Sequence, residues 1–328
     1  VATNYVPSYC YNYIQLWYDF REDVIRRELG WAGDCGINSL RMFLPLFSFQ
    51  EGGRWQEVKA GFRGFMRLAE EAGMSVMITF QPNYMRIEMS GKPQTPYVDF
   101  KPGKHQNHWQ YPESGFSNFK EHPAALEDMY AMTDDIMHEY REDKRVIAWD
   151  LWNEAPQDER YTVECLFNHA RKINPSQPLT ACWEAYDISD IVTFHNYTKP
   201  AVTEDKYVYP GNTGKQYPAN ASLDFIPELE RALSYNRPVL CTECLARTRG
   251  HENTFELFLP FFAKYRIGFY FWGLCAGSAQ YHFPWGWPEG TPEPKDWFHC
   301  ILYPNGEAYR EEEILLLRNF RFVPEGKP

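Results

Sequence analysis

Short apolar runs alternate with longer amphipathic segments along most of the chain. In one of the longer segments Val58, Phe62, Phe65 and Ala69 recur every three or four positions, and Gly73 follows as a suitable C-terminal cap. This is the helical period, whereas the apolar runs have the length of buried strands. Repetition of the strand–helix unit predicts a parallel sheet covered by helices.

Eight such units are predicted from this pattern. The strands are predicted over residues 11–17, 37–44, 74–80, 146–152, 178–183, 191–197, 238–243 and 267–273. The helices are predicted from about residue 21 to Gly36 and near residues 58–69, 126–140, 163–173, 226–233, 255–262 and 314–317. Eight units in 328 residues predict an α/β fold, a (β/α)8 TIM barrel that forms a single domain over residues 1–328.

The connections after strands three, six and eight are predicted to be long loops. They cover residues 83–122, 198–220 and 274–298 and are rich in polar residues, Pro and Gly. Long loops in a compact domain are usually functional. They are compatible with a closed pocket for short or terminal substrates and equally with an extended cleft.

Composition and charge limit the class of partner. The formal net charge of −11 argues against nucleic acid and anionic membranes, because both require a basic surface. No apolar run reaches the roughly 18 residues of a membrane span. The first residues, VATNYVPS, lack the basic start and apolar run of a signal peptide, and a terminus from which such a peptide had been removed would look the same. Aromatic residues make up 17% of the chain, which suits sugar faces and an aromatic-rich core equally well.

The eight cysteines are scattered and do not form a disulfide framework. Cys241 and Cys244 are the one close pair, in C-T-E-C, but residues three apart on a strand point to opposite faces. No second pair or nearby His accompanies them, so a metal site is not expected.

Polar residues gather where the predicted strands end. Active sites of such barrels lie at the carboxyl ends of the strands. The polar and aromatic candidates are Asn153 and Glu154 on strand four, His195 and Tyr197 on strand six, Glu243 on strand seven, Trp272 on strand eight and Arg41 on strand two. The two glutamates would face each other across the mouth, and a pair roughly 5 Å apart suits retaining glycoside hydrolysis. Burial would raise the pKa of the acid, while Arg41 or Tyr197 would keep the other carboxylate ionised.

These motifs resemble the clan A glycoside hydrolases and, within them, family 5 (cellulase-like). The matching motifs are G-I-N-S-L-R (36–41), W-D-L-W-N-E (149–154), H-N-Y (195–197), V-L-C-T-E (239–243) and F-W-G (271–273). The resemblance implies that Glu154 is the acid/base, Glu243 the nucleophile, and that no cofactor is needed. It also implies that Asn153 bonds the sugar 2-hydroxyl and Tyr197 the nucleophile, that Arg41 supports Glu243, and that His195 and Trp272 line the subsite.

Several further residues are candidates for contact with substrate. A His common in the family after strand three has two possible equivalents, His105 and His108, in H-Q-N-H-W. The indole rings of Trp109, Trp183, Trp285, Trp287 and Trp297 suit sugar stacking or loop packing. Glu184, His282 and Glu289 are weaker candidates, and Asp150 is expected to be a buried support.

The expected function is that of a retaining β-glycosidase acting on β-linked oligo- or polysaccharide through a glycosyl-enzyme on Glu243. A transglycosylase and a carbohydrate-binding barrel without turnover remain alternatives. A metal-dependent hydrolase would need His and Asp ligands on several strand ends, and only strand six offers a His. A carbohydrate is the expected partner, the oligomeric state is open, and a polymeric substrate favours a secreted or periplasmic location over a cytoplasmic one.

Overall fold

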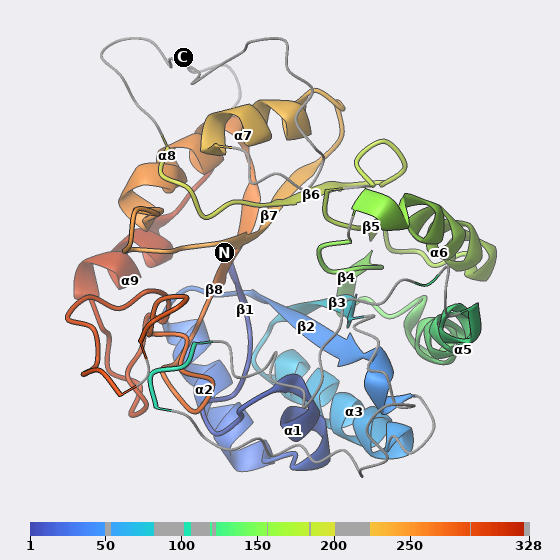
Figure 1. Ribbon diagram of the computed structural model, residues 1–328, viewed down its shortest axis with the longest axis horizontal. Helices are drawn as coiled ribbons and strands as arrows, with labels where there is room; N and C mark the ends of the chain where they lie inside the picture. The colour runs from blue at the N-terminus through green and yellow to red at the C-terminus, as the bar shows by residue number, and fades with distance from the viewer. Residues whose placement is uncertain are drawn as a thin grey trace.

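The computed structural model describes residues 1–49, 54–81, 102–105, 119, 123–155, 157–183, 185–200, 224–288 and 290–324. Eight parallel strands form one sheet in the order β5-β4-β3-β2-β1-β8-β7-β6. The helices lie around the outside of this sheet (Figure 1). The predicted (β/α)8 barrel is confirmed.

The strands are β1 Ala2–Asn4, β2 Ser39–Pro45, β3 Ser75–Gln81, β4 Val146–Asp150, β5 Leu179–Thr180, β6 Val192–His195, β7 Val239–Cys244 and β8 Gly268–Trp272. The helices are α1 Tyr13–Tyr18, α2 Glu22–Asp34, α3 Trp55–Glu71, α5 Pro123–Tyr140, α6 Arg160–Ile173, α7 Phe225–Leu233, α8 Phe255–Tyr265 and α9 Glu311–Asn319. Short 3-10 turns cover Leu46–Ser48 and Gln157–Glu159. Strands two to eight therefore lie where the apolar runs predicted them, with shifted ends. Most of the predicted loops at 83–122 and 198–220 lie outside the described residues.

The prediction of strand one is wrong. Residues 13–18 form helix α1, and the first strand is β1, three residues long, which pairs with both β2 and β8. The Asn12 side chain caps α1 by accepting a hydrogen bond from the Gln15 backbone N–H at 2.8 Å, and Gln15 Oε1 accepts from the Tyr11 N–H. Such reciprocal capping favours a helix over the strand that the apolar pattern also fits.

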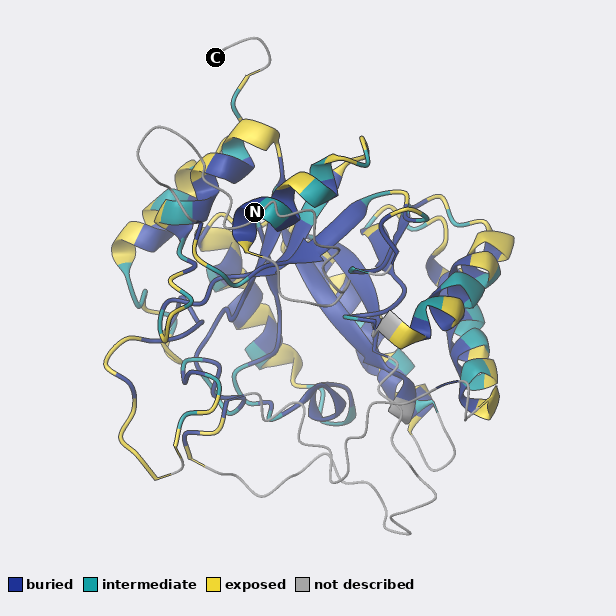
Figure 2. Ribbon diagram, turned by 45° about the horizontal axis from the view of Figure 1, so that its top comes forward, coloured by how far each residue is buried: buried dark blue, intermediate teal, exposed yellow. Residues whose placement is uncertain are grey.

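The core has one layer between strands and helices and another inside the barrel. The strands are buried almost throughout, whereas the helices bury one face and expose the other (Figure 2). Met77, Ala148 and Tyr270 form a separate cluster with Ala2. They alternate along their strands with residues that pack against the helices, so they fill the barrel interior.

The barrel closes between β5 and β6 through individual hydrogen bonds. No strand ladder joins these two strands among the residues that the structure describes. Buried Thr180 and Thr193 join across this gap by a hydroxyl–hydroxyl bond of 2.9 Å, and the Asp190 N–H donates to Leu179 O at 2.8 Å. Within the described part of the chain, none of the helices is both long and apolar enough to cross a membrane.

Candidate active site

The carboxyl ends of β1, β2, β4, β6 and β7 bring the candidate polar side chains together. The register of the strands places these residues at the same height along the barrel axis. Asn4, for example, pairs with Arg41 on one neighbouring strand and with Trp272 on the other. His195 lies beside Glu243 after a shift in the register of β6 and β7. Their side chains therefore meet at one end of the barrel, as expected for this fold.

Arg41 is the centre of a buried polar network. It is fully buried, and its Nη1 donates to Glu243 Oε1 at 2.9 Å. Its Nη2 donates to Asp150 Oδ2 and to Asn153 Oδ1, both at 2.6 Å. Burial opposes the charge of Arg41, but the charges of Asp150 and Glu243 outweigh burial and raise its pKa. Asp150 is itself fully buried and paired with Arg41, as expected of a support below the site.

Asn4 belongs to this network and was missed by the sequence prediction. Its Oδ1 accepts a 2.9 Å hydrogen bond from Arg41 Nη1, and its Nδ2 donates to backbone carbonyls of Thr242, Tyr270 and Phe271. Asn4 therefore ties Arg41 to β7 and β8. Correct placement of the first strand would have put an Asn at its carboxyl end, which is the signal that could have found it.

Glu154, His195 and Glu243 face one another. One side-chain oxygen or nitrogen of each lies within 4.8 Å of those of the other two. His195 Nδ1 lies 2.7 Å from Glu154 Oε1 and 3.5 Å from Glu243 Oε2. Tyr197 donates its hydroxyl to Glu243 Oε2 at 2.7 Å, so the expected hydrogen bond is present. Glu243 thus receives bonds from Arg41 and Tyr197, one on each oxygen.

The surroundings separate the two carboxyl groups. Burial raises the pKa of Glu154 to about 7, against a smaller lowering effect of Arg41, although 35% of its side chain is exposed. Burial also raises the pKa of Glu243, and the nearby charge of Glu154 adds to this rise, whereas Arg41 and Tyr197 oppose it. Burial lowers the pKa of His195 to about 4, so its imidazole is neutral near pH 7. Glu154 can therefore hold a proton near neutral pH, whereas Glu243 has the two hydrogen-bond donors that favour its anion.

Two backbone conformations at the site are unusual. Glu154 has φ 54° and Trp183 has φ 66°, in the left-handed region that non-glycine residues rarely adopt. Such strain persists where the surrounding structure fixes it and is common at active sites. Gly273, directly after Trp272, has φ 89°, and a Cβ there would lie 2.6 Å from the Cys300 backbone N.

His105 lies in an aromatic cluster beside Tyr197. It is buried, its Nδ1 hydrogen-bonds Phe283 O, and its ring centroid lies 5.0 Å from His299 and 5.9 Å from Trp285. The rings of Trp285 and His299 in turn contact the Tyr197 ring, with centroid distances of 5.0 and 5.6 Å, respectively. His105 therefore packs behind the two rings that contact Tyr197. His299 was not among the residues predicted from the sequence.

The other predicted residues fall into three groups. Trp183 contacts the His195 ring at 5.7 Å, and Trp272 packs edge-on against Phe43 and Tyr281. Trp297 stacks on Tyr309 with ring centroids 4.4 Å apart, and Trp287 donates its indole N–H to Pro292 O at 3.2 Å, so both rings pack within loops. His108, Trp109, Glu184 and Glu289 lie outside the described residues.

The charges at the site bear on whether it could hold a metal ion. Glu154, His195 and Glu243 form the one group of three possible metal ligands within the described part of the chain. Arg41, hydrogen-bonded to Glu243, places a fixed positive charge beside them and would oppose a cation. Two carboxyls, a neutral imidazole and a bound guanidinium instead suit proton transfer and attack at carbon.

Comparison with solved structures identifies the fold. A GH5_18 structure from Bifidobacterium longum subsp. infantis has a TM-score of 0.62 at 14% identity, covering 98% of this chain and 79% of that one. An exo-β-1,4-mannosidase from Opitutaceae bacterium strain TAV5 has a TM-score of 0.61 at 16% identity, covering 97% and 58%. The chain has the fold of these glycoside hydrolases. The fold that the family 5 resemblance implied is thus confirmed.

Other comparisons delimit this result. A GH5_18 variant from Streptomyces cattleya in complex with Manβ1-4GlcNAc has a TM-score of 0.59 at 12% identity, covering 98% of this chain and 83% of that one. The chain spans about half (47%) of the length of a β-glucuronidase from an uncultured Clostridium sp.. No protein-family model and no curated protein sequence matches the chain.

Proposed function

We propose that the protein is a retaining β-glycosidase in which Glu243 is the nucleophile and Glu154 the acid/base. The observation that carries the proposal is the approach of the two carboxyl groups to within 4.8 Å. Retaining enzymes hold their carboxyl groups about 5–5.5 Å apart, whereas inverting enzymes leave room for a water at larger separations. The short separation therefore supports attack by a carboxylate.

The reaction has two balanced steps. In the first, the Glu243 carboxylate bonds to the anomeric carbon while the bond from that carbon to the leaving oxygen breaks, and Glu154 gives its proton to that oxygen. In the second, Glu154 takes a proton from water, the hydroxide oxygen bonds to the anomeric carbon, and Glu243 leaves as a carboxylate. Arg41 and Tyr197 stabilise the charge that Glu243 carries before and after the covalent intermediate.

The remaining side chains supply positioning. Arg41 donates to Asn153 Oδ1, which leaves the amide NH2 of Asn153 as the group that would bond the sugar 2-hydroxyl. His195 holds Glu154 at 2.7 Å, and Trp272 and Trp183 supply ring faces for the reacting sugar. We also propose that His105 and Trp285 affect the substrate indirectly, by helping to position Tyr197.

For the substrate we propose a β-linked oligo- or polysaccharide, with β-mannosides tested first. The support is that one similar structure is named an exo-β-1,4-mannosidase and another holds Manβ1-4GlcNAc. A secreted or periplasmic location remains part of the proposal because polymeric substrates lie outside cells.

The test is hydrolysis of p-nitrophenyl β-mannoside, β-glucoside and other β-glycosides, with Glu243→Ala and Glu230→Gln compared. Glu230 is an exposed residue of α7, so its variant serves as the matched control. We expect Glu243→Ala alone to abolish turnover, and ¹H NMR to show release of the β-anomer first. Initial release of the α-anomer would refute the retaining mechanism.

The two alternatives are separated by further measurements. A 2-deoxy-2-fluoro-β-glycosyl fluoride should label Glu243, located by peptide mapping, and a barrel without turnover would stay unlabelled. Product analysis with and without an added sugar acceptor distinguishes transfer from hydrolysis.

A further inference from the structure

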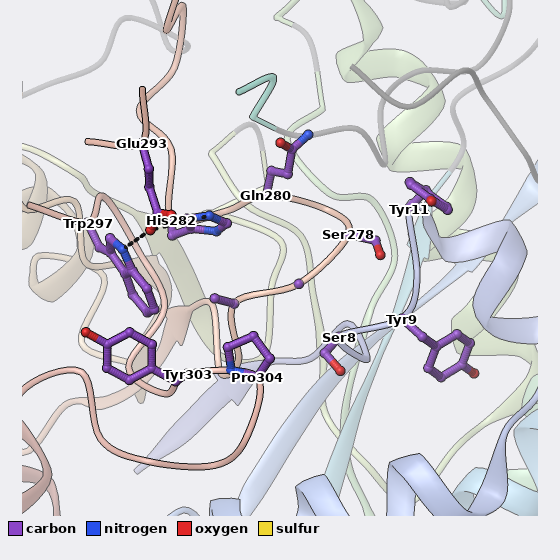
Figure 3. Close-up of a pocket in the computed structure, with 12 residues that line it drawn as sticks. Ser8, Tyr9, Tyr11, Ser278, Gln280, His282, Glu293, Trp297, Tyr303 and Pro304 are labelled. Carbon is purple, nitrogen blue, oxygen red and sulfur yellow. Dashed lines mark hydrogen bonds and ion pairs between the residues drawn. The ribbon is translucent and has the colours of Figure 1, made fainter. Parts of the chain in front are cut away.

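A cavity lies on the rim of the barrel, between the loop after β1 and the loop after β8 (Figure 3). Its volume is about 570 Å³, within the range of pockets that bind small molecules. The residues that line it include the aromatic side chains of Tyr9, Tyr11, Trp297 and Tyr303 and the polar side chains of His282 and Glu293. None of them belongs to the carboxylate site described above.

The wall of the cavity is held in place by neighbouring loops. Gln280 Oε1 accepts from the Gly103 N–H at 2.7 Å, and its Nε2 donates to Lys104 O at 3.3 Å. The next residue, Tyr281, instead packs edge-on against Trp272 at 5.6 Å. One loop segment therefore contributes to the cavity and to the catalytic site, so the cavity lies beside that site and is pre-formed.

The cavity combines aromatic rings with polar groups. Tyr9 and Tyr11 lie on one side of it, with Trp297 and Tyr303 on the other (Figure 3). Tyr303 is the most open of the latter pair, since 38% of it is exposed, whereas the Trp297 ring is stacked on Tyr309. Exposed ring area in a polar pocket suits a ligand with apolar faces and many hydroxyls.

Two polar side chains in the cavity have spare hydrogen-bonding capacity. His282 Nδ1 is buried without a hydrogen-bond partner, and its Nε2 lies 3.9 Å from Glu293 Oε1. Burial lowers the pKa of His282 to about 4, so the imidazole is neutral near pH 7. Glu293 accepts one bond from Trp297 Nε1 at 2.7 Å and is otherwise half exposed.

The charge of the cavity excludes one class of ligand. Within the described residues Glu293 has no Lys or Arg partner, so its carboxylate would repel phosphates and acidic sugars. Carboxylate oxygens and an imidazole nitrogen, by contrast, are good partners for hydroxyl groups. A neutral polyhydroxylated ligand fits both conditions.

We propose that this cavity is a non-catalytic binding site for a sugar ring of a neutral oligosaccharide or polysaccharide. Tyr303 offers the ring face, and Glu293 and His282 bond the hydroxyls. The ligand class rests on the proposed function, whereas the binding measurement below does not require turnover.

The test uses the Glu243→Gln protein, which can bind a sugar chain without cleaving it. Crystals soaked in β-1,4-mannohexaose or cellohexaose show whether a sugar ring occupies the cavity between Tyr303 and His282. Calorimetric titration of the same hexaoses is repeated after adding Tyr303→Ala or Glu293→Gln. Each added substitution should lower the affinity of the hexaose for the cavity about tenfold, which is the loss expected for one stacking or hydrogen-bonding partner.

The matched control is Tyr265→Ala, because Tyr265 is as exposed as Tyr303, at 39%, and does not line the cavity. It should leave the hexaose affinity unchanged, and thermal unfolding should confirm that all variants are folded. An empty cavity in the soaked crystals, or equal affinities in all variants, would refute the inference. A protein that hydrolyses aryl glycosides but leaves the cavity empty refutes only this inference, and one that fills it without hydrolysis refutes only the proposed function.

Discussion

The carboxyl groups of Glu154 and Glu243 lie close together but have different neighbours. Glu243 receives hydrogen bonds from Arg41 and Tyr197, whereas Glu154 lies against the neutral imidazole of His195. Two donors favour the anion at Glu243, and burial favours the acid at Glu154. The roles of the two residues can therefore be tested separately.

For Tyr197→Phe we expect the acidic limb of the kcat/KM profile to move to higher pH. The variant loses a donor that stabilises the Glu243 anion, so the pKa of Glu243 rises. In the proposed mechanism Glu243 must be ionised to attack. At neutral pH kcat/KM should fall roughly tenfold or more. Tyr161→Phe, on the exposed surface of α6, is the control, and an unshifted acidic limb would contradict the assignment.

The acid/base role proposed for Glu154 predicts a basic limb of the kcat/KM profile near pH 7. The pKa of Glu154 is raised to about 7, so the proton is present below that pH and is lost as pH rises through it. In Glu154→Gln this limb should disappear, and added azide should restore turnover of an aryl glycoside with a good leaving group. Formation of a β-glycosyl azide by Glu154→Gln but not by Glu243→Gln is the diagnostic product.

At the scale of the elements, helix α1 depends on its cap. The Asn12 side chain satisfies the Gln15 N–H, so Asn12→Ala should lower the free energy of unfolding by about 1 kcal/mol. Urea denaturation measures this loss. Lys172→Ala, an exposed change in the last turn of α6, should change it by less than about 0.5 kcal/mol. Equal effects would mean that the cap contributes little.

Gly273, in the turn after β8, has a positive φ and also lies close to another part of the backbone. Comparison with Gly73, which has only the positive φ, separates these two requirements. Gly273 and Gly73 both have positive φ, at 89° and 69°, but only at Gly273 would a Cβ meet another backbone, 2.6 Å from Cys300 N. Gly273→Ala should therefore cost about 2 kcal/mol more than Gly73→Ala in urea denaturation. It should also lower kcat, because Trp272 precedes the turn. Similar losses in both variants would leave only the backbone conformation as the cause.

The sequence was sufficient to predict those strands whose run of apolar residues is long enough to have one interpretation. Long apolar runs such as residues 74–80 and 146–152 predicted β3 and β4, and the carboxyl ends of the strands predicted the side chains that meet. β1 could not be predicted this way, because three residues, Ala2–Asn4, are too few to show a period. Asn4 was lost with it, and the contact of His299 with Tyr197 depends on how a long loop folds back.

At the scale of the whole molecule, the barrel closes at a seam between β5 and β6 that includes two threonines. Thr180 and Thr193 hydrogen-bond at 2.9 Å where β5 and β6 lack a ladder. Glu154 follows β4 on one side of this seam, and His195 ends β6 on the other. Across the seam, Glu154 Oε1 and His195 Nδ1 lie 2.7 Å apart. Closure of the barrel and geometry of the site are therefore coupled.

A double-mutant cycle at this seam tests the coupling. Thr180→Val or Thr193→Val alone leaves a buried hydroxyl without its partner and should cost about 1–3 kcal/mol. The double variant removes both hydroxyls, so its loss should be smaller than the sum of the single losses. Since each single variant disturbs the seam, kcat should fall in both and partly recover in the double variant. Thr133→Val, buried on α5 away from the seam, should leave kcat unchanged, and additive losses at the seam would show that the hydroxyl pair does not close the barrel.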